Sequence, residues 1–209
     1  MACAGFANKA DAPELMVREG EVFPAYYVRL IRKLLDLESP PEALMICLSG
    51  QHEMTEDFTG FRGFFTLNFI PKPIYNAHVL ASKLKEQLLD AEVETDALSV
   101  IPTKDEKGRY AVLLSYTKDE CEAPLGDREE TLVFEGDLSG KTFTVYLIDR
   151  EHTNPYRLWQ KEGEPEVLTA EQLAAYREAG KLKPVQVTPA AKTLPLHLTA
   201  NATYLILAE

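Results

Sequence analysis

The segment Gly60–Leu89, GFRGFFTLNFIPKPIYNAHVLASKLKEQLL, and the shorter segment Ala43–Leu48, ALMICL, decide how this chain is organised. The shorter segment is continuously apolar, which is typical of a parallel strand covered on both faces. After a polar loop, Pro73 stands where the first turn of a helix accepts proline. Apolar residues then recur at helical spacing as far as Leu88, which predicts an amphipathic helix.

A further helix is predicted upstream of this strand. Apolar residues recur at helical spacing from Phe23 to about Leu37, and Ser39-Pro40-Pro41 ends the pattern. The order helix, buried strand, long loop, helix is one unit of a repeated α/β arrangement. We therefore expect an α/β segment in residues 1–90.

The sequence pattern changes after Asp90, from helical spacing of apolar residues to short strand-like runs. Short β-branched and aromatic runs, most of them separated by turn residues, predict an antiparallel β-sandwich over residues 91–209. These runs are Ser99–Thr103, Tyr110–Thr117, Thr131–Glu135, Thr142–Asp149, Val185–Thr188, Leu194–Thr199 and Tyr204–Leu207. One inserted helix is expected after Thr169, because Thr169-Ala170-Glu171-Gln172 is a capping box and Gly180 supplies a stop.

Composition and charge exclude several classes of function. The chain has 209 residues, a formal charge of −11 and 26% charged residues, as in an ordinary acidic globular protein. Binding to nucleic acid is not expected, because affinity for a phosphate backbone comes from Lys and Arg. No apolar run is long enough to cross a membrane, and the N-terminal residues do not resemble a signal peptide. A cytoplasmic protein is expected.

The three cysteines, Cys3, Cys47 and Cys121, have no short spacing that would predict a zinc site or a disulfide framework. Asp149, Glu151, His152 and Asn154 lie close together, but their spacing matches no compact oxygen-ligand loop. We expect these four to fix a turn of the sandwich and its contact with the first segment. Neither a metal nor a cofactor is expected.

Three stretches together resemble the C-terminal portion of a glycoside hydrolase of family 39, the family of β-xylosidases and α-L-iduronidase. The first runs from Ala43 through GFRGFFTLNFIPKPIYNAHVLASKL, the second is Leu147–Gly163, LIDREHTNPYRLWQKEG, and the third is the C-terminal LPLHLTANATYLILAE. The resemblance implies that residues 1–90 are a remnant of a TIM barrel. They would contain its last helix–strand–helix unit (helix 7, strand 8 and helix 8 of a (β/α)8 barrel), followed by the sandwich.

The same resemblance implies retaining hydrolysis of glycosidic bonds by two glutamates. If the first helix follows barrel strand 7, both glutamates lie upstream of Met1, so no catalytic residue is expected in this chain. Cys47 also stands where family members commonly carry a tryptophan that lines the sugar site. The expected function is therefore part of a β-xylosidase-like enzyme, inactive alone, whose carbohydrate partner is a xylose-type glycoside once the barrel is completed.

The loop after Ala43–Leu48 holds the remaining candidates. Glu53, Glu56 and Asp57 are carboxylates, but retaining hydrolysis needs a pair about 5–5.5 Å apart with one member sheltered from water. We expect a solvated acidic loop. In a complete enzyme, His52, Glu53 and Arg62 of this loop are the candidate substrate-binding residues, through hydrogen bonds to sugar hydroxyls.

Two alternatives to a glycosidase remain. A non-catalytic carbohydrate-binding sandwich would need Tyr156, Trp159 or another ring exposed as a stacking platform, whereas the resemblance makes Tyr156 and Trp159 packing residues. A protein-interaction module would use the sandwich and the barrel strand, because an unpaired strand exposes its N–H and C=O groups. The two barrel helices would also leave apolar faces bare. We therefore expect the chain to need the missing barrel segment or self-association.

Overall fold

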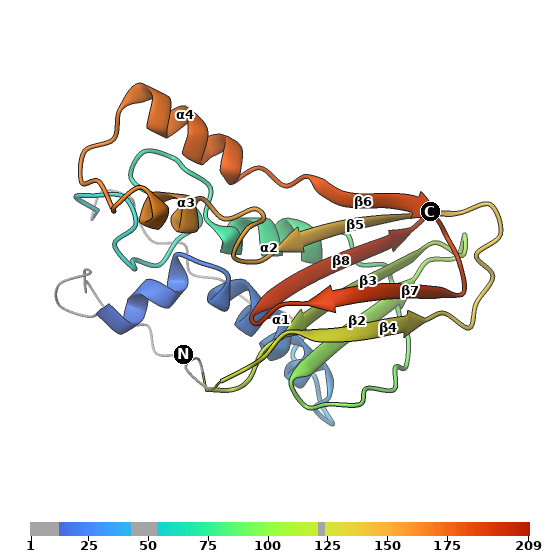
Figure 1. The fold of residues 1–209 in the computed structure, drawn as a ribbon. Helices are drawn as coiled ribbons and strands as arrows, with labels where there is room; N and C mark the ends of the chain where they lie inside the picture. Colours follow the sequence, from blue (N-terminus) through green and yellow to red (C-terminus); the bar gives the residue numbers. More distant parts are fainter. Residues whose placement is uncertain (1–12, 43–53, 121–123) are drawn as a thin grey trace.

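The computed structural model describes residues 13–42, 54–120 and 124–209 (Figure 1). In chain order the elements are η1 Pro13–Arg18, α1 Val22–Leu35, α2 Pro73–Ala81, β1 Gln87–Leu88, β2 Leu98–Lys104, β3 Tyr110–Tyr116, β4 Arg128–Val133, β5 Thr142–Ile148, α3 Pro155–Lys161, α4 Ala170–Ala179, β6 Pro184–Pro189, β7 Thr193–Leu198 and β8 Ala202–Ala208. A six-stranded antiparallel sheet has the order β1-β2-β3-β8-β5-β6, and β4 pairs with β7 in a two-stranded sheet. The predicted antiparallel domain with the helix after Thr169, α4, is confirmed, whereas α3 is a second inserted helix that was not predicted.

The large sheet is covered on both faces, which explains its apolar centre. Every residue of β3 and β8 is buried. On one face Val112, Tyr204 and Ile206 pack with inward residues of β4 and β7 such as Leu196. This side is the predicted sandwich. Only one face of the smaller sheet is buried, and the residues of β7 are therefore alternately exposed and buried along the strand.

Helices cover the opposite face of the same sheet. Val28 of α1 and Ala77 and Leu80 of α2 are fully buried in one cluster with Leu113 of β3 and Leu205 of β8. Residues from both sides of the expected boundary at residue 90 therefore share a hydrophobic core. The helices direct apolar residues onto the sheet, and the only large apolar side chain of α1 or α2 that is exposed is Leu30. The expected extensive bare face is absent from these two helices.

A third cluster joins the loop before α2 to the inserted helices. Phe58, Tyr156, Trp159 and Tyr176 are buried together with Ile70. Phe58 lies 5.1 Å from Trp159 and 5.8 Å from Tyr156 between ring centroids. Figure 1 shows α3 and α4 side by side, away from the two-stranded sheet. We refer to residues 54–72 as the aromatic loop.

The second predicted helix is shorter than expected. It ends at Ala81 rather than near Leu88, and Gln87–Leu88 instead forms β1 against β2. The Lys85 N–H also donates to Thr103 Oγ1 at 2.9 Å. Residues 87 and 88 pair with the edge of the sheet instead of continuing the helix. Tertiary pairing therefore overrides the helical spacing of Leu84 and Leu88. Ala43–Leu48 lies outside the described residues, and the barrel remnant remains a prediction.

Candidate functional site

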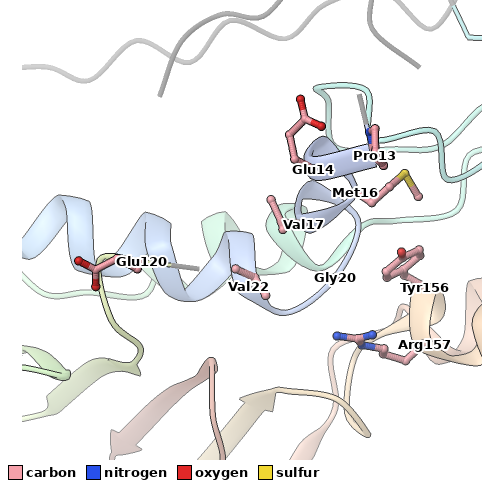
Figure 2. Close-up of a pocket in the computed structure, with 9 residues that line it drawn as sticks. All are labelled: Pro13, Glu14, Met16, Val17, Gly20, Val22, Glu120, Tyr156 and Arg157. Carbon is pink, nitrogen blue, oxygen red and sulfur yellow. The ribbon is translucent and has the colours of Figure 1, made fainter. Parts of the chain in front are cut away.

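A hollow of about 540 Å³ lies between η1, the start of α1 and the start of α3 (Figure 2). Its lining is Pro13, Glu14, Met16, Val17, Gly20, Val22, Glu120, Tyr156 and Arg157. Gly20 allows the close approach of the chain to an aromatic ring, since a Cβ there would lie 3.1 Å from Cδ1 of Tyr156. The lining is mainly apolar, with carboxylates from two distant segments.

The two carboxylates of the hollow do not form a retaining pair. Glu14 and Glu120 are both exposed, and Figure 2 shows them at opposite ends of the lining. A glycosidase general acid needs an environment that disfavours its charged form, and retaining hydrolysis needs a second carboxyl about 5–5.5 Å away. The hollow supplies neither condition from these two side chains.

The start of α1 is joined to the start of α3 below the hollow. Glu21, the residue that precedes α1, is fully buried and accepts hydrogen bonds from Arg157 Nε at 3.0 Å and Arg157 Nη2 at 2.5 Å. Asn154, which caps α3, donates to Glu21 Oε2 at 2.9 Å. Burial alone would raise the pKa of Glu21, but the hydrogen bonds and charge of Arg157, with Asn154, lower it below its usual value. Glu21 therefore stays ionised and is unsuited to donate a proton.

A second buried ion pair joins Glu19, the residue after η1, to the aromatic loop. Lys72 Nζ lies 2.6 Å from Glu19 Oε1, and the two side chains are 1% and 0% exposed. The same oxygen of Glu19 accepts the Gly60 N–H at 2.8 Å, and Lys72 also donates to the Phe61 carbonyl at 2.8 Å. Lys72 immediately precedes α2, so the starts of α1, α2 and α3 each carry a member of one of these two ion pairs.

Asp57 does not behave as the solvated acid that the sequence predicted. Its side chain is buried, and its two oxygens accept hydrogen bonds from Asn68 N at 2.8 Å and Asn68 Nδ2 at 2.6 Å. That prediction was wrong for Asp57, because folding of the aromatic loop brings Asn68 over it. Glu56 is exposed, as expected for a solvated side chain.

The predicted substrate-binding residues remain untested. His52 and Glu53 lie outside the described residues, whereas Arg62 is half-buried in the aromatic loop. Arg62 belongs to the same loop as Asp57 and Lys72 by its position in the chain. Sequence reasoning missed the roles of Glu19 and Glu21; the only signal was the spacing of acidic residues in Arg18-Glu19-Gly20-Glu21, directly before an apolar helix.

Two predictions about the segment after β5 are confirmed. Asp149 Oδ1 accepts hydrogen bonds from the backbone N–H groups of Glu151 and His152 and from His152 Nδ1, which fixes the turn. Asn154 then joins this turn to Glu21, the expected contact with the first segment. Tyr156 and Trp159 are 7% and 4% exposed, so they are packing residues and offer no stacking platform.

The described residues include no group of three or more His, Cys, Asp or Glu side chains arranged to hold a metal ion. Within the same parts of the chain, no helix is long and apolar enough to cross a membrane.

Comparisons with known proteins address the identity of the chain. The model of the glycosyl hydrolases family 39 matches residues 7–195. A β-xylosidase of Caldicellulosiruptor saccharolyticus is 26% identical over 131 residues, which are 63% of this chain and 27% of that protein. The chain therefore spans about a quarter of the length of this relative.

Solved structures agree with this match at the level of the fold. A family 39 β-xylosidase from Caulobacter crescentus superposes with a TM-score of 0.74 at 20% identity, covering 92% of this chain and 40% of that one. A bacterial orthologue of human α-L-iduronidase gives a TM-score of 0.71 at 18% identity, covering 92% of this chain and 38% of that one. The resemblance to the C-terminal portion of these enzymes is confirmed, and the chain belongs to family 39 of the glycosyl hydrolases.

Proposed function

We propose that this chain is one part of a retaining glycoside hydrolase that acts on xylose-type glycosides, and that both catalytic glutamates come from outside it. In this proposal residues 1–90 complete the end of a (β/α)8 barrel, and residues 91–209 form the accessory sandwich. The aromatic loop and the residues before it face the substrate, with His52, Glu53 and Arg62 binding sugar hydroxyls. The chain alone is inactive.

The observation that carries the proposal is the state of the carboxylates in a chain of this family. Among the described residues, the buried acids Glu19, Glu21, Asp57, Asp105 and Asp149 each hold a structural contact with a cation or with N–H donors. The acids of the hollow are exposed. Retaining hydrolysis needs one sheltered acid beside one free carboxylate. This arrangement supports a catalytic pair supplied by another segment.

The direct test is hydrolysis of aryl β-xylosides, other aryl glycosides and aryl iduronides by the purified 209-residue chain, with light scattering on the same sample. We expect no turnover above buffer, whereas a complete family 39 β-xylosidase serves as the positive control. Turnover by the chain alone would overturn the proposal and direct attention to Glu53, Glu56 and Asp57.

A complementation experiment tests the positive half of the proposal. The chain is mixed with a barrel segment of a family 39 β-xylosidase that carries both glutamates and lacks the matching portion. We expect aryl β-xyloside hydrolysis to appear only in the mixture. Arg62→Ala should then lower kcat/KM by roughly 10- to 100-fold through loss of a charged hydrogen bond. Arg128→Ala, at another half-buried arginine, is the matched control, because Arg128 lies on β4 of the small sheet.

A further inference from the structure

An unusual backbone conformation lies at the tip of the aromatic loop. Phe65 and Pro71 form an antiparallel bridge, and Thr66 N donates to the Ile70 carbonyl at 3.0 Å. The connection between Thr66 and Ile70 is the three-residue turn Leu67-Asn68-Phe69. Turns of this length commonly place their last residue in the left-handed region, and that position favours glycine.

Here the left-handed position is occupied by phenylalanine. Phe69 has a φ of 58°, and its N–H donates to the Thr66 carbonyl at 3.1 Å. This backbone disfavours a bulky residue relative to glycine by roughly tenfold in equilibrium. Burial of the ring does not offset that cost, because Phe69 is 63% exposed. Local strain without compensating packing points to a role for the ring outside the fold.

The turn that presents the ring is held by several polar contacts. Asn68 donates from its backbone N–H and its side chain to the buried carboxylate of Asp57 at 2.8 and 2.6 Å. Arg177 Nη2, from α4, donates to the Asn68 carbonyl at 2.7 Å. The ring is therefore presented from a fixed backbone, so that a ligand does not have to order the turn when it binds.

The surroundings of the ring indicate the chemistry of its ligand. The side chains that hydrogen-bond to this turn from outside it are charged, namely the buried Asp57 and the exposed Arg177. A pyranose ring offers one apolar C–H face for an aromatic ring and a rim of hydroxyls for a guanidinium group. The combination of Phe69 and Arg177 matches that pattern.

We propose that Phe69 and Arg177 form a binding platform for one sugar ring of a xylose-type oligosaccharide. The choice of xylose rests on the proposed function, whereas the platform itself rests on the exposed, left-handed Phe69 and the contacts that hold its turn. Neither residue lines the hollow of Figure 2. The site is thus an additional contact for a longer carbohydrate chain.

The test is a titration of the ¹⁵N-labelled 209-residue chain with xylotetraose, followed by amide chemical shifts, with maltotetraose as a comparison ligand. In the wild type we expect saturable shifts centred on Asn68, Phe69 and Ile70. Phe69→Gly should weaken binding at least about tenfold, whereas Phe69→Tyr, which keeps the ring, should stay within about threefold. Val167→Gly, at another strongly exposed apolar residue, is the matched control and should change nothing.

Unfolding of the same variants by urea separates a binding role from a structural one. Phe69→Gly should lower the unfolding equilibrium constant roughly three- to tenfold, because glycine adopts this backbone without strain. Destabilisation by Phe69→Gly would show that the ring supports the fold, and it would overturn the proposal.

Absence of saturable shifts in the wild type, or unchanged binding by Phe69→Gly, would also overturn it. Concentration-dependent association that Phe69→Gly abolishes would assign the ring to a protein contact instead. Because the titration needs no catalysis, its result is independent of the hydrolysis and complementation experiments. Those experiments can fail while sugar binding at Phe69 persists, and the reverse also holds.

Discussion

The six-stranded sheet and the aromatic loop lie next to each other but are stabilised by different sets of contacts. The two central strands, β3 and β8, are buried along their whole length and rich in apolar side chains. Apart from one isolated bridge, the aromatic loop has no strand pairing; the charged residues Glu19, Lys72 and Asp57 hold it from buried positions. Stability of the sheet comes from many apolar contacts, whereas that of the loop comes from one aromatic cluster around Phe58 together with a few buried polar contacts.

The largest expected effect comes from breaking the buried ion pair of the loop. Lys72→Met leaves the fully buried Glu19 carboxylate without its counter-ion. Removing one partner of a buried pair costs about 3–5 kcal/mol, because an uncompensated charge remains inside. Urea unfolding should report this loss, and hydrogen exchange should show loss of protection at the Gly60 amide, which donates to Glu19.

The double variant Glu19→Leu/Lys72→Met is the control for that experiment. Replacing both charges with apolar side chains of similar size is often neutral or stabilising. We expect the double variant to recover most of the free energy of unfolding without recovering protection of the Gly60 amide. Recovery of both would mean that the pair has no specific part in placing the loop.

A smaller loss is expected from a single apolar truncation in the sheet. Leu205→Ala removes a fully buried side chain between β8 and the helices, and such truncations cost about 2–5 kcal/mol. Leu30→Ala, at a side chain that is 42% exposed, should cost less than about 1 kcal/mol. Equal losses in the two variants would contradict the assignment of the helix–sheet core.

The dependence of stability on pH should differ between α2 and the two-stranded sheet. His78 of α2 donates from Nδ1 to the Ile74 carbonyl at 2.8 Å and stacks on Tyr27 at 4.1 Å. Burial lowers the pKa of His78 below its usual value, an effect that the Ile74 carbonyl partly offsets. The unfolded chain therefore takes up the proton first, and stability should fall as the pH drops from about 6.5 through the lower folded pKa.

His197, on β7 of the small sheet, should show the opposite sign. Its Nδ1 lies 2.6 Å from Glu129, which raises its pKa. The contribution of His197 to the free energy of unfolding is present below its pKa in the unfolded chain, and it is lost as the pH rises through its pKa in the folded protein. Urea titrations of His78→Phe and His197→Gln between pH 5 and pH 8 separate the contribution of His78 from that of His197. If both variants lost the same dependence of stability on pH, the opposite pKa directions assigned to the two histidines would be contradicted.

The smallest effect is expected at the surface of α1. Arg32 and Asp36 form an exposed pair one helical turn apart, and the contact lowers the pKa of Asp36. Exposed pairs of this kind contribute at most about 0.5 kcal/mol. Arg32→Gln should therefore leave the urea midpoint nearly unchanged, and the difference should shrink further in 1 M salt. A loss as large as that of Lys72→Met would show that exposure does not separate the two kinds of ion pair.

The strands of the sandwich could be predicted because their signal is local. Short runs such as Tyr110–Thr117 and Tyr204–Leu207 stand between turn residues, and both become strands with nearly the predicted bounds. The inserted helix was equally readable from the capping box at Thr169, which the structure contains. The second helix was predicted too long. The helical spacing of Leu84 and Leu88 does not reveal that Leu88 pairs with β2 at the edge of the sheet.

The candidate site was far less predictable. Tyr156 and Trp159 were correctly expected to pack, but Asp57 was expected in solvent and is buried under Asn68. Glu19 and Lys72 are separated by 53 positions in the chain, and nothing in their local sequence indicates that they meet. The substrate-binding roles of His52, Glu53 and Arg62 remain predictions.

By itself, the sequence determined the family, the antiparallel domain, the two helices before it and α4 within it, because periodicity and turn residues act over a few neighbouring positions. The tertiary structure alone decided which charges are buried, which helix starts converge and that Phe69 remains exposed in a left-handed backbone. The reason is physical. Burial of a charge depends on partners brought together by the fold, and a pattern along the chain carries no information about the distance between such partners.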